Sequence, residues 1–176
     1  MRIISGTHKS RIISAPKNLP VRPTTDFAKE SLFNILNNNF DFTTLKILDL
    51  FAGTGNITYE FASRGCLATT SVDSNHHCCS FIKKTADELN FKNITVLKSD
   101  VFSFLNNNNS KYNLIFADPP YEMEGIEKIP ALVFEKKILF PNGWLIIEHS
   151  AKTKFTEQQQ LLQQRNYGKV NFSIFG

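Results

Sequence analysis

Long apolar runs are missing from this chain, so no segment is long enough to span a bilayer. The first residues, 1–6, also lack the apolar stretch of a signal peptide. Only three cysteines are present, and two of them, Cys78 and Cys79, are adjacent, which argues against a disulfide framework. We therefore expect a cytoplasmic protein that does not associate with membranes. Its 176 residues fit one domain, 1–176, and we expect a monomer.

Carboxylates are absent from the first 25 residues, although this segment holds five cations: Arg2, Lys9, Arg11, Lys17 and Arg22. The other 15 of the 20 cations are balanced by all 16 acids, so the net charge of +4 originates in residues 1–25. A short positive segment suits a phosphate backbone. We predict that 1–25 form a basic extension that binds nucleic acid through these cations, ahead of a catalytic core at 26–176. The alternative is a solvated basic tail.

Beyond this extension, short apolar runs alternate with segments of helical periodicity. Residues 2–5 and 11–14 have the pattern of two short strands, and a helix is expected from Asp26 to about Asn37. The patterns predict further strands at 46–51, 68–73, 94–98, 112–117, 144–148, 161–166 and 169–175, with helices at 56–64, 75–89, 101–105 and 125–138.

This alternation predicts an α/β fold with a mostly parallel sheet and helices on both of its faces. The last two strands flank a turn at 167–168, so we expect an antiparallel hairpin at the sheet edge. A short β extension is expected at the N-terminus, and the asparagine run 106–109 predicts a surface loop.

A glycine-containing loop, 48–55, follows the first predicted parallel strand, where ligands bind in open α/β sheets. Gly53 and Gly55 permit a tight turn and a close approach of the backbone to a ligand. The third glycine of a dinucleotide fingerprint is replaced by Thr58, and the Gly-Lys-Ser/Thr of a phosphate-binding loop is absent. Asp49 would repel a pyrophosphate but suits a phosphate-free cation. S-adenosylmethionine, a sulfonium with an ammonium group, is therefore the predicted cofactor.

One further acid ends the next predicted strand, and another follows the strand after it. Asp73 lies 18 positions after Gly55, at the distance where an acid commonly accepts hydrogen bonds from a ribose. Asp100 is a candidate acceptor for the adenine amine. Each acid alone would more often be a surface or capping residue, but three acids at successive strand ends favour a cofactor site. We place Phe51, Ser74 and Val101 in the same site.

The tetrapeptide Asp118-Pro119-Pro120-Tyr121 directly follows a buried-strand pattern and is the predicted catalytic segment. An aromatic exocyclic amine is a poor nucleophile because its lone pair is delocalised into the ring. The Asp118 carboxylate and the Pro119 carbonyl can accept both N–H bonds and expose that lone pair. Pro120 stiffens the turn, and Tyr121 offers a face on which a flipped-out base can stack. Asp118 can also accept the proton that the amine releases.

These residues resemble the amino-methyltransferases whose catalytic segment reads Asn/Asp-Pro-Pro-aromatic. Within that class the chain resembles the RsmD family of bacterial small-subunit (16S) rRNA guanine-N2 methyltransferases, essentially from end to end. The matching segments are 2–6 (Arg-Ile-Ile-Ser-Gly), 22–26 (Arg-Pro-Thr-Thr-Asp), 29–34 (Lys-Glu-Ser-Leu-Phe-Asn), 48–55, 63–65 (Ser-Arg-Gly), 118–121 and 167–168. The tetrapeptide is common to many methyltransferases, whereas 22–26 is much more specific to this family.

The resemblance implies a seven-stranded, Rossmann-like class I S-adenosylmethionine-dependent methyltransferase fold with an N-terminal extension that helps to bind RNA. It implies methylation of guanine N2 in small-subunit rRNA, either free or in the 30S particle. It places the segment around Thr24 beside the cofactor, so Thr24 joins the predicted cofactor contacts. By this match Asp73 binds the ribose, where the family often has glutamate, and Phe27 stands where the family commonly has arginine.

Two other functions stay open. An adenine-N6 methyltransferase acting on RNA or DNA is one, because the tetrapeptide does not choose the base. A non-catalytic RNA-binding module is the other, and the intact Asp49, Asp73 and Asp118 argue against it. The absence of a separate target-recognition domain argues against a sequence-specific DNA enzyme.

Other polar residues receive structural interpretations. The run 76–79 (His-His-Cys-Cys) places adjacent side chains in different directions on a helix, so we expect no metal site. Glu148 and His149 end a predicted strand and are interpreted as capping or packing residues. Cys66 and Trp144 are expected in the core.

Overall fold

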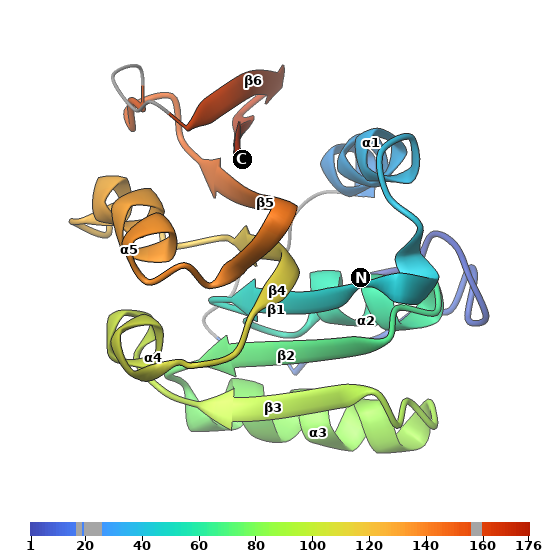
Figure 1. Cartoon of the computed structure of the whole chain (residues 1–176). Helices are drawn as coiled ribbons and strands as arrows, with labels where there is room; N and C mark the ends of the chain where they lie inside the picture. The colour runs from blue at the N-terminus through green and yellow to red at the C-terminus, as the bar shows by residue number, and fades with distance from the viewer. Residues whose placement is uncertain (17–18, 20–25, 156–159) are drawn as a thin grey trace.

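The computed structural model describes residues 1–16, 19, 26–155 and 160–176. Within these residues seven strands form one sheet in the order β3-β2-β1-β4-β5-β7-β6 (Figure 1). The strands are β1 (Lys46–Leu50), β2 (Ala68–Asp73), β3 (Ile94–Lys98), β4 (Tyr112–Ala117), β5 (Leu139–His149), β6 (Leu161–Tyr167) and β7 (Val170–Phe175). Strands β1 to β5 pair in parallel, and β7 runs antiparallel to both β5 and β6. The predicted parallel sheet with an antiparallel hairpin at its edge is confirmed.

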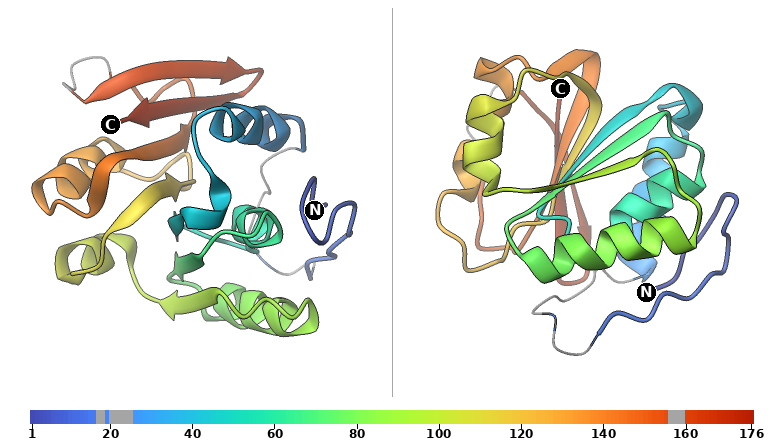
Figure 2. Two further views of the ribbon diagram at one scale, coloured as in Figure 1. Left: turned by 45° about the vertical axis from the view of Figure 1, so that its right-hand side comes forward. Right: turned by 90° about the horizontal axis from the view of Figure 1, so that it is seen from below.

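Helices cover both faces of the sheet, as predicted. In Figure 2, α1, α2 and α3 lie on one face, and α4 and α5 lie on the other. No helix in the described part of the chain is long and apolar enough to cross a membrane. The helices are α1 (Asp26–Asn37), α2 (Asn56–Ser63), α3 (His76–Glu88), α4 (Val101–Asn107) and α5 (Ile129–Glu135), with short 3₁₀ turns η1 (Phe42–Thr44) and η2 (Ile126–Lys128).

Two predictions need correction at helix ends. Residues 125–138 do not form one helix, because η2 precedes α5 and Pro130 stands in the first turn of α5, a position that tolerates a missing N–H. The asparagine run 106–109 is only partly a loop, because α4 continues through Asn107. The Asn107 side chain donates to the Ser103 carbonyl at 2.8 Å, which satisfies an acceptor of this last turn.

Side chains of the central strands alternate between two cores, as a sheet covered on both faces requires. Ile47 and Phe116 belong to the cluster that contains α1 and α2, whereas Leu48 and Ile115 belong to the cluster that contains α4 and α5. Asp49 follows Ile47 by two positions, so it faces the α1–α2 side. This alternation fixes the face on which the acids at the strand ends project.

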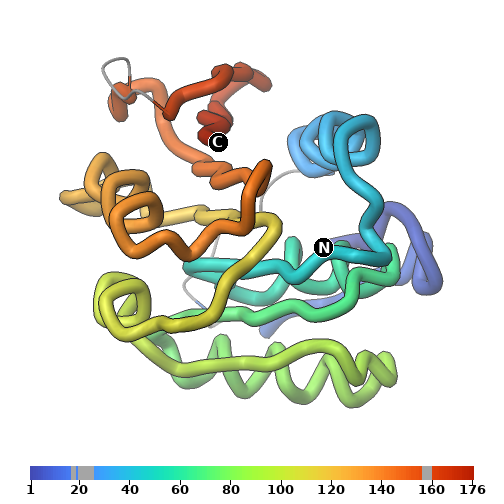
Figure 3. Tube along the Cα trace, viewed as in Figure 1, coloured from blue at the N-terminus to red at the C-terminus, as the bar shows by residue number. Residues whose placement is uncertain are grey.

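The predicted β extension at the N-terminus is present, but it is shorter than the two strands expected at 2–5 and 11–14. A single antiparallel bridge joins Arg2 to Ile12. The ladder stops there because the Ile4 and Ser5 amides donate to the two carboxylate oxygens of Glu60 in α2, at 2.7 and 3.1 Å. Residues 1–16 of the extension therefore dock beside α2, apart from β6 (Figures 2 and 3).

Three charged side chains anchor this extension, and we call Lys29, Glu60 and Arg64 the arm cluster. Lys29 and Glu60 have fully buried side chains 3.5 Å apart, and Arg64 Nε lies 2.9 Å from Glu60 Oε1. Lys29 also donates to the Arg2 carbonyl and, at 2.8 Å, to Asn56 Oδ1. Burial lowers the pKa of Lys29, and the neighbouring Glu60 carboxylate opposes that shift. The arm cluster thus joins the extension, α1 and α2 through compensated charges.

Candidate active site

A cavity of about 1030 Å³ lies at the carboxyl ends of the parallel strands, where this type of sheet binds ligands. Its walls contain eleven of the predicted site residues: Asp49, Phe51, Gly53, Asp73, Ser74, Asp100, Val101, Asp118, Pro119, Pro120 and Tyr121. Gly55 does not line the cavity. It has a φ of +81°, and a side chain there would collide with the Tyr59 ring, so Gly55 serves the turn into α2. The structure thus brings the two predicted motifs into one space.

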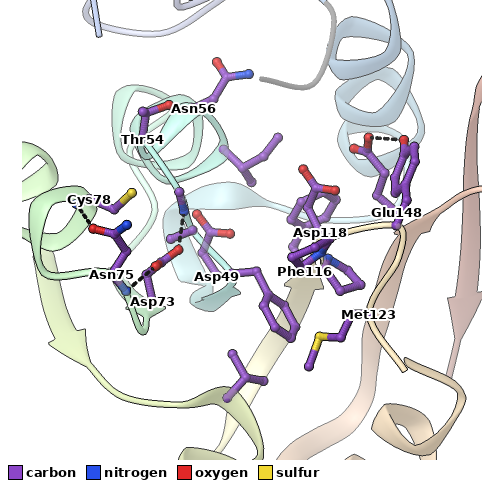
Figure 4. Close-up of a pocket in the computed structure, with 18 of the residues that line it drawn as sticks. Asp49, Thr54, Asn56, Asp73, Asn75, Cys78, Phe116, Asp118, Met123 and Glu148 are labelled. Carbon is purple, nitrogen blue, oxygen red and sulfur yellow. Dashed lines mark hydrogen bonds between the residues drawn. The ribbon is translucent and has the colours of Figure 1, made fainter. Parts of the chain in front are cut away.

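Strand register explains why these acids converge. In the β1–β2 and β1–β4 pairs, Asp49 stands opposite Ser71 and Phe116. Asp73 and Asp118 lie two positions beyond those partners and therefore share the same parity. Figure 4 shows Asp73, Asn75 and Cys78 on one side of the cavity, Asp118 and Glu148 on the other, and Asp49 between them. The site therefore has two halves, because β2 and β4 lie on opposite sides of β1 in the sheet.

One half contains the predicted cofactor residues, so we call it the cofactor half, and it is built around Asp73. The Gly53 amide donates to Asp73 Oδ2 and the Asn75 amide donates to Oδ1, both at 2.8 Å. Gly53 has a φ of +54°, a conformation that glycine adopts without strain, and this aims its amide at β2. A carboxylate has roughly four acceptor sites, so these two bonds are compatible with a ribose hydroxyl as a further donor.

Asp49 occupies the floor of this half and is 2% exposed. The Thr58 hydroxyl donates to its carboxylate, and Thr58 is also bonded to Ser71. Burial raises the pKa of Asp49 to about 7, and the nearby Asp73 charge adds to this rise, while the bonds from Thr58 oppose it. A buried carboxylate that is only partly ionised at neutral pH is stabilised in its charged form by a cation.

Asp100 has two roles in the structure. Its side chain caps α4 by accepting from the Ser103 amide at 2.8 Å, and the residue also lines the cavity. The capping alternative from the sequence is therefore correct without removing Asp100 from the site. Cys78, which the sequence assigned no site role, lines the same half.

The other half contains the predicted catalytic tetrapeptide, so we call it the catalytic half, and it begins where β4 ends. The Asp118 amide donates to the Leu50 carbonyl at 3.3 Å, which ties the tetrapeptide to the cofactor loop. The Met123 amide donates to the Pro120 carbonyl at 2.9 Å and closes the following turn. Tyr121 is 38% exposed, and its hydroxyl donates to Glu148 Oε1 at 3.2 Å. The ring is thereby held at the cavity wall with part of its surface accessible.

Glu148 is an acid of the cavity wall that sequence reasoning missed. Its interpretation as a capping or packing residue is incomplete, because Glu148 is 3% exposed and lines the cavity. The available signal was the same as for the other acids, since Glu148 also ends a parallel strand. His149 does fit that interpretation. Its ring is bonded to Ser150 and Ser173, each at 2.8 Å, and burial lowers its pKa.

Among the predicted RNA-binding cations, the three that the structure describes, Arg2, Lys9 and Arg11, do not line the cavity. Arg2 forms an ion pair with Asp26 at 3.3 Å, with half of its side chain exposed, and Lys9 and Arg11 are exposed on the extension. Lys17, Arg22 and Thr24 lie outside the described residues. The hairpin supplies a cation that was not predicted, because Lys169 lines the cavity.

The hairpin also brings an aromatic residue to the cavity. Tyr167 lines the wall, and its ring lies edge-on to Phe27, with the centroids 6.1 Å apart. Phe27 is 68% exposed, so this pair forms part of the accessible rim. Cys66, Cys78 and Cys79 are buried free thiols, and no group of three metal-ligand side chains occurs among the described residues.

Solved structures define the class of fold. The yhhF protein of Escherichia coli superposes with a TM-score of 0.85 at 26% identity, over 99% of this chain and 96% of that one. Coclaurine N-methyltransferase, solved with S-adenosylhomocysteine, superposes at 20% identity with a TM-score of 0.56, over 72% of this chain and 36% of that one. The fold is that of the class I S-adenosylmethionine-dependent methyltransferases.

The particular family follows from the sequence. The family described as "conserved hypothetical protein 95" matches residues 1–176. The ribosomal RNA small subunit methyltransferase D of Buchnera aphidicola subsp. Baizongia pistaciae is 30% identical over 179 residues, which is 99% of this chain and 91% of that relative. The chain belongs to this family, and the resemblance to the RsmD family is confirmed.

Proposed function

We propose that this protein transfers a methyl group from S-adenosylmethionine to the exocyclic N2 amine of a guanine in small-subunit rRNA. The observation that carries the proposal is the presence of two chemically distinct halves in one cavity. One half offers Asp49 and Asp73 beside a glycine turn, and the other offers Asp118, Pro119 and Tyr121.

The cofactor half fits S-adenosylmethionine, which supplies an electrophilic methyl group when bound. Asp49 is a buried carboxylate whose charged form gains from a cation and would repel a phosphate. Asp73 would accept from the ribose hydroxyls and Asp100 from the adenine amine. Gly53 leaves the backbone accessible because it has no side chain.

The catalytic half fits an aromatic amine. The Asp118 carboxylate and the Pro119 carbonyl would accept the two N–H bonds, so that the nitrogen lone pair is directed toward the cofactor half. After the new N–C bond forms, the nitrogen carries a positive charge and releases one proton, for which Asp118 is the acceptor. Tyr121 would stack on the base, because its hydroxyl is held by Glu148 and its ring is partly exposed.

The rRNA substrate is inferred from the family and from charge. The Buchnera relative is named as a methyltransferase of small-subunit rRNA, and this chain carries its positive excess in residues 1–25. Arg2, Lys9 and Arg11 are the described cations of that extension. We expect RNA phosphates to contact them while a splayed-out guanine enters the cavity.

The test is radiolabelled methyl transfer in parallel to unmethylated 30S particles, naked rRNA and DNA, followed by nucleoside analysis. N2-methylguanosine in RNA is the expected product. N6-methyladenine would support the alternative of an adenine methyltransferase, and absence of transfer to any substrate would support a non-catalytic RNA-binding module.

A further inference from the structure

Two carboxylates stand next to each other at the catalytic end of the sheet. In the parallel β4–β5 pair, Ala117 is opposite Ile147, so Asp118 and Glu148 occupy the next equivalent positions. Neighbouring strands are about 4.8 Å apart, and equivalent positions in register face the same side. Figure 4 shows both carboxylates on the same side of the cavity, away from Asp73.

Glu148 has properties that a surface acid lacks. It is 3% exposed, it lies on β5 between β4 and β7, and it lines the cavity. An ionised carboxylate only accepts hydrogen bonds and has roughly four acceptor sites, so the bond from Tyr121 is compatible with another donor. A ligand that presents an N–H at this point of the wall would meet a carboxylate acceptor.

We infer that Glu148 reads the base by accepting the N1–H of the target guanine while Asp118 accepts from the N2 amine. This inference rests on the proposed function. Guanine presents N1–H and the N2 amine side by side, which matches two adjacent carboxylates. Adenine places an unprotonated N1 beside its amine, so its lone pair would face the Glu148 carboxylate. Glu148 is thus the residue that selects guanine, a choice that the tetrapeptide does not make.

The other cavity acids do not suit this role. Asp73 lies two strands from β4 in the sheet order, and both of its carboxylate oxygens bond to backbone amides. Asp49 stands opposite Phe116, which is two positions before Asp118 and therefore deeper in the sheet. Among the described residues that line the cavity, Glu148 on β5 is the acid beside Asp118 on the side away from the cofactor half.

The test compares guanine with 2-aminopurine at the methylated position of small subunits reassembled from site-specifically modified rRNA. 2-Aminopurine keeps the 2-amine but has an unprotonated N1. We expect the natural chain to prefer guanine by roughly 10- to 100-fold in kcat/KM, as is typical when a buried charged acceptor loses its donor. Equal rates on the two bases would overturn the inference.

Glu148→Gln supplies the second half of the test. The carboxamide can donate to an unprotonated N1, so we expect the guanine preference to fall at least about tenfold relative to the natural chain. The guanine to 2-aminopurine ratio of kcat/KM is compared between the natural chain and the variant. This comparison cancels the difference in amine reactivity between the bases and the effect of the O6 that 2-aminopurine lacks. Cofactor affinity and the thermal unfolding midpoint, measured on the same variant, check that its fold and cofactor half are intact. An unchanged preference in a folded variant would also overturn the inference.

Tyr121→Phe is the matched control. It removes the hydroxyl that bonds to Glu148 but leaves the carboxylate in place. We expect slower methylation of both bases and an unchanged preference. If this variant loses the preference as Glu148→Gln does, Glu148 acts only by positioning Tyr121, and the inference is wrong.

Failure of the proposed function has a separate signature. If the natural chain methylates adenine, or methylates no RNA, the proposed function and the role of Glu148 both fail. If it methylates guanine N2 but accepts 2-aminopurine equally well, the proposed function stands and only the role of Glu148 is lost.

Discussion

Glu60 and Asp49 are both buried carboxylates, but their charges are compensated differently. Glu60 is fully buried and contacts the cations Lys29 and Arg64 as well as two backbone amides of the extension. Asp49 is 2% exposed and is bonded to the neutral Thr58, with no ion pair among the described residues. Its pKa accordingly rises to about 7. The arm cluster therefore serves the fold, whereas the cavity acids are arranged for a ligand.

The largest expected effect comes from removing the carboxylate of the predicted catalytic segment. Asp118→Ala should lower kcat by on the order of 10³-fold or more, because the amine loses both an acceptor and a route for its proton. The affinity for S-adenosylmethionine should stay nearly unchanged, since Asp118 lies in the other half. Single-turnover methylation and isothermal titration measure the two quantities. Full activity in this variant would contradict the role of Asp118. It would also remove the distinction between the acids that line the cavity and Glu60 of the arm cluster.

In the arm cluster, removing an acid should lower the stability of the fold. Glu60→Ala leaves Lys29 buried without its partner and removes the acceptor of two amides, so the free energy of unfolding should fall by about 3–5 kcal/mol. Urea denaturation measures this change. Glu88→Ala is the matched control, because the Lys84–Glu88 pair is solvent-exposed at 3.8 Å and should contribute less than about 0.5 kcal/mol. If Glu60→Ala and Glu88→Ala lower the free energy of unfolding by similar amounts, the arm cluster does not anchor the extension.

The Asp49 prediction concerns pH. Because its pKa is about 7 in the free protein and a cationic ligand favours the ionised form, binding must release a proton below pH 7. The Kd for S-adenosylmethionine should weaken roughly tenfold from pH 8 to pH 6 as Asp49 becomes protonated. Titration calorimetry between pH 6 and pH 8 tests whether the Kd rises as the pH falls. Asp49→Asn should bind more weakly at pH 8 and show no such dependence; a dependence that persists in this variant would assign the proton to another group.

The difference between the two regions also explains what the sequence could predict. Asp49, Asp73 and Asp118 could be predicted as site residues from the sequence, because each lies at or near the end of an apolar run. The carboxyl ends of parallel strands lie at the same edge of a sheet. The role that we propose for Glu148 depends on the β4–β5 register, which pairs Ala117 with Ile147 and cannot be read from either segment alone.

The arm cluster was not predictable at all, for a physical reason. Glu60 lies inside a short helix and resembles a solvent-facing residue, yet its partners Ile4 and Ser5 are 56 and 55 positions away. These side-chain bonds replaced the expected strand ladder of the extension. Local periodicity reports the elements of a fold, whereas bonds between distant segments decide how a terminal extension docks.

The smallest expected effect tests whether the docked extension also binds RNA. Arg11 is exposed on the extension, so Arg11→Ala should leave the fold intact and weaken rRNA binding by a few-fold. Removing one cation that pairs with a phosphate should reduce the slope of log K against log salt by about 1, because fewer counterions are released. Lys84→Ala is the control, since this exposed cation lies on α3 and outside the extension. Binding isotherms at several salt concentrations measure both slopes. An unchanged slope for Arg11→Ala, or equal changes in the two variants, would mean that the extension is held against α2 for stability alone.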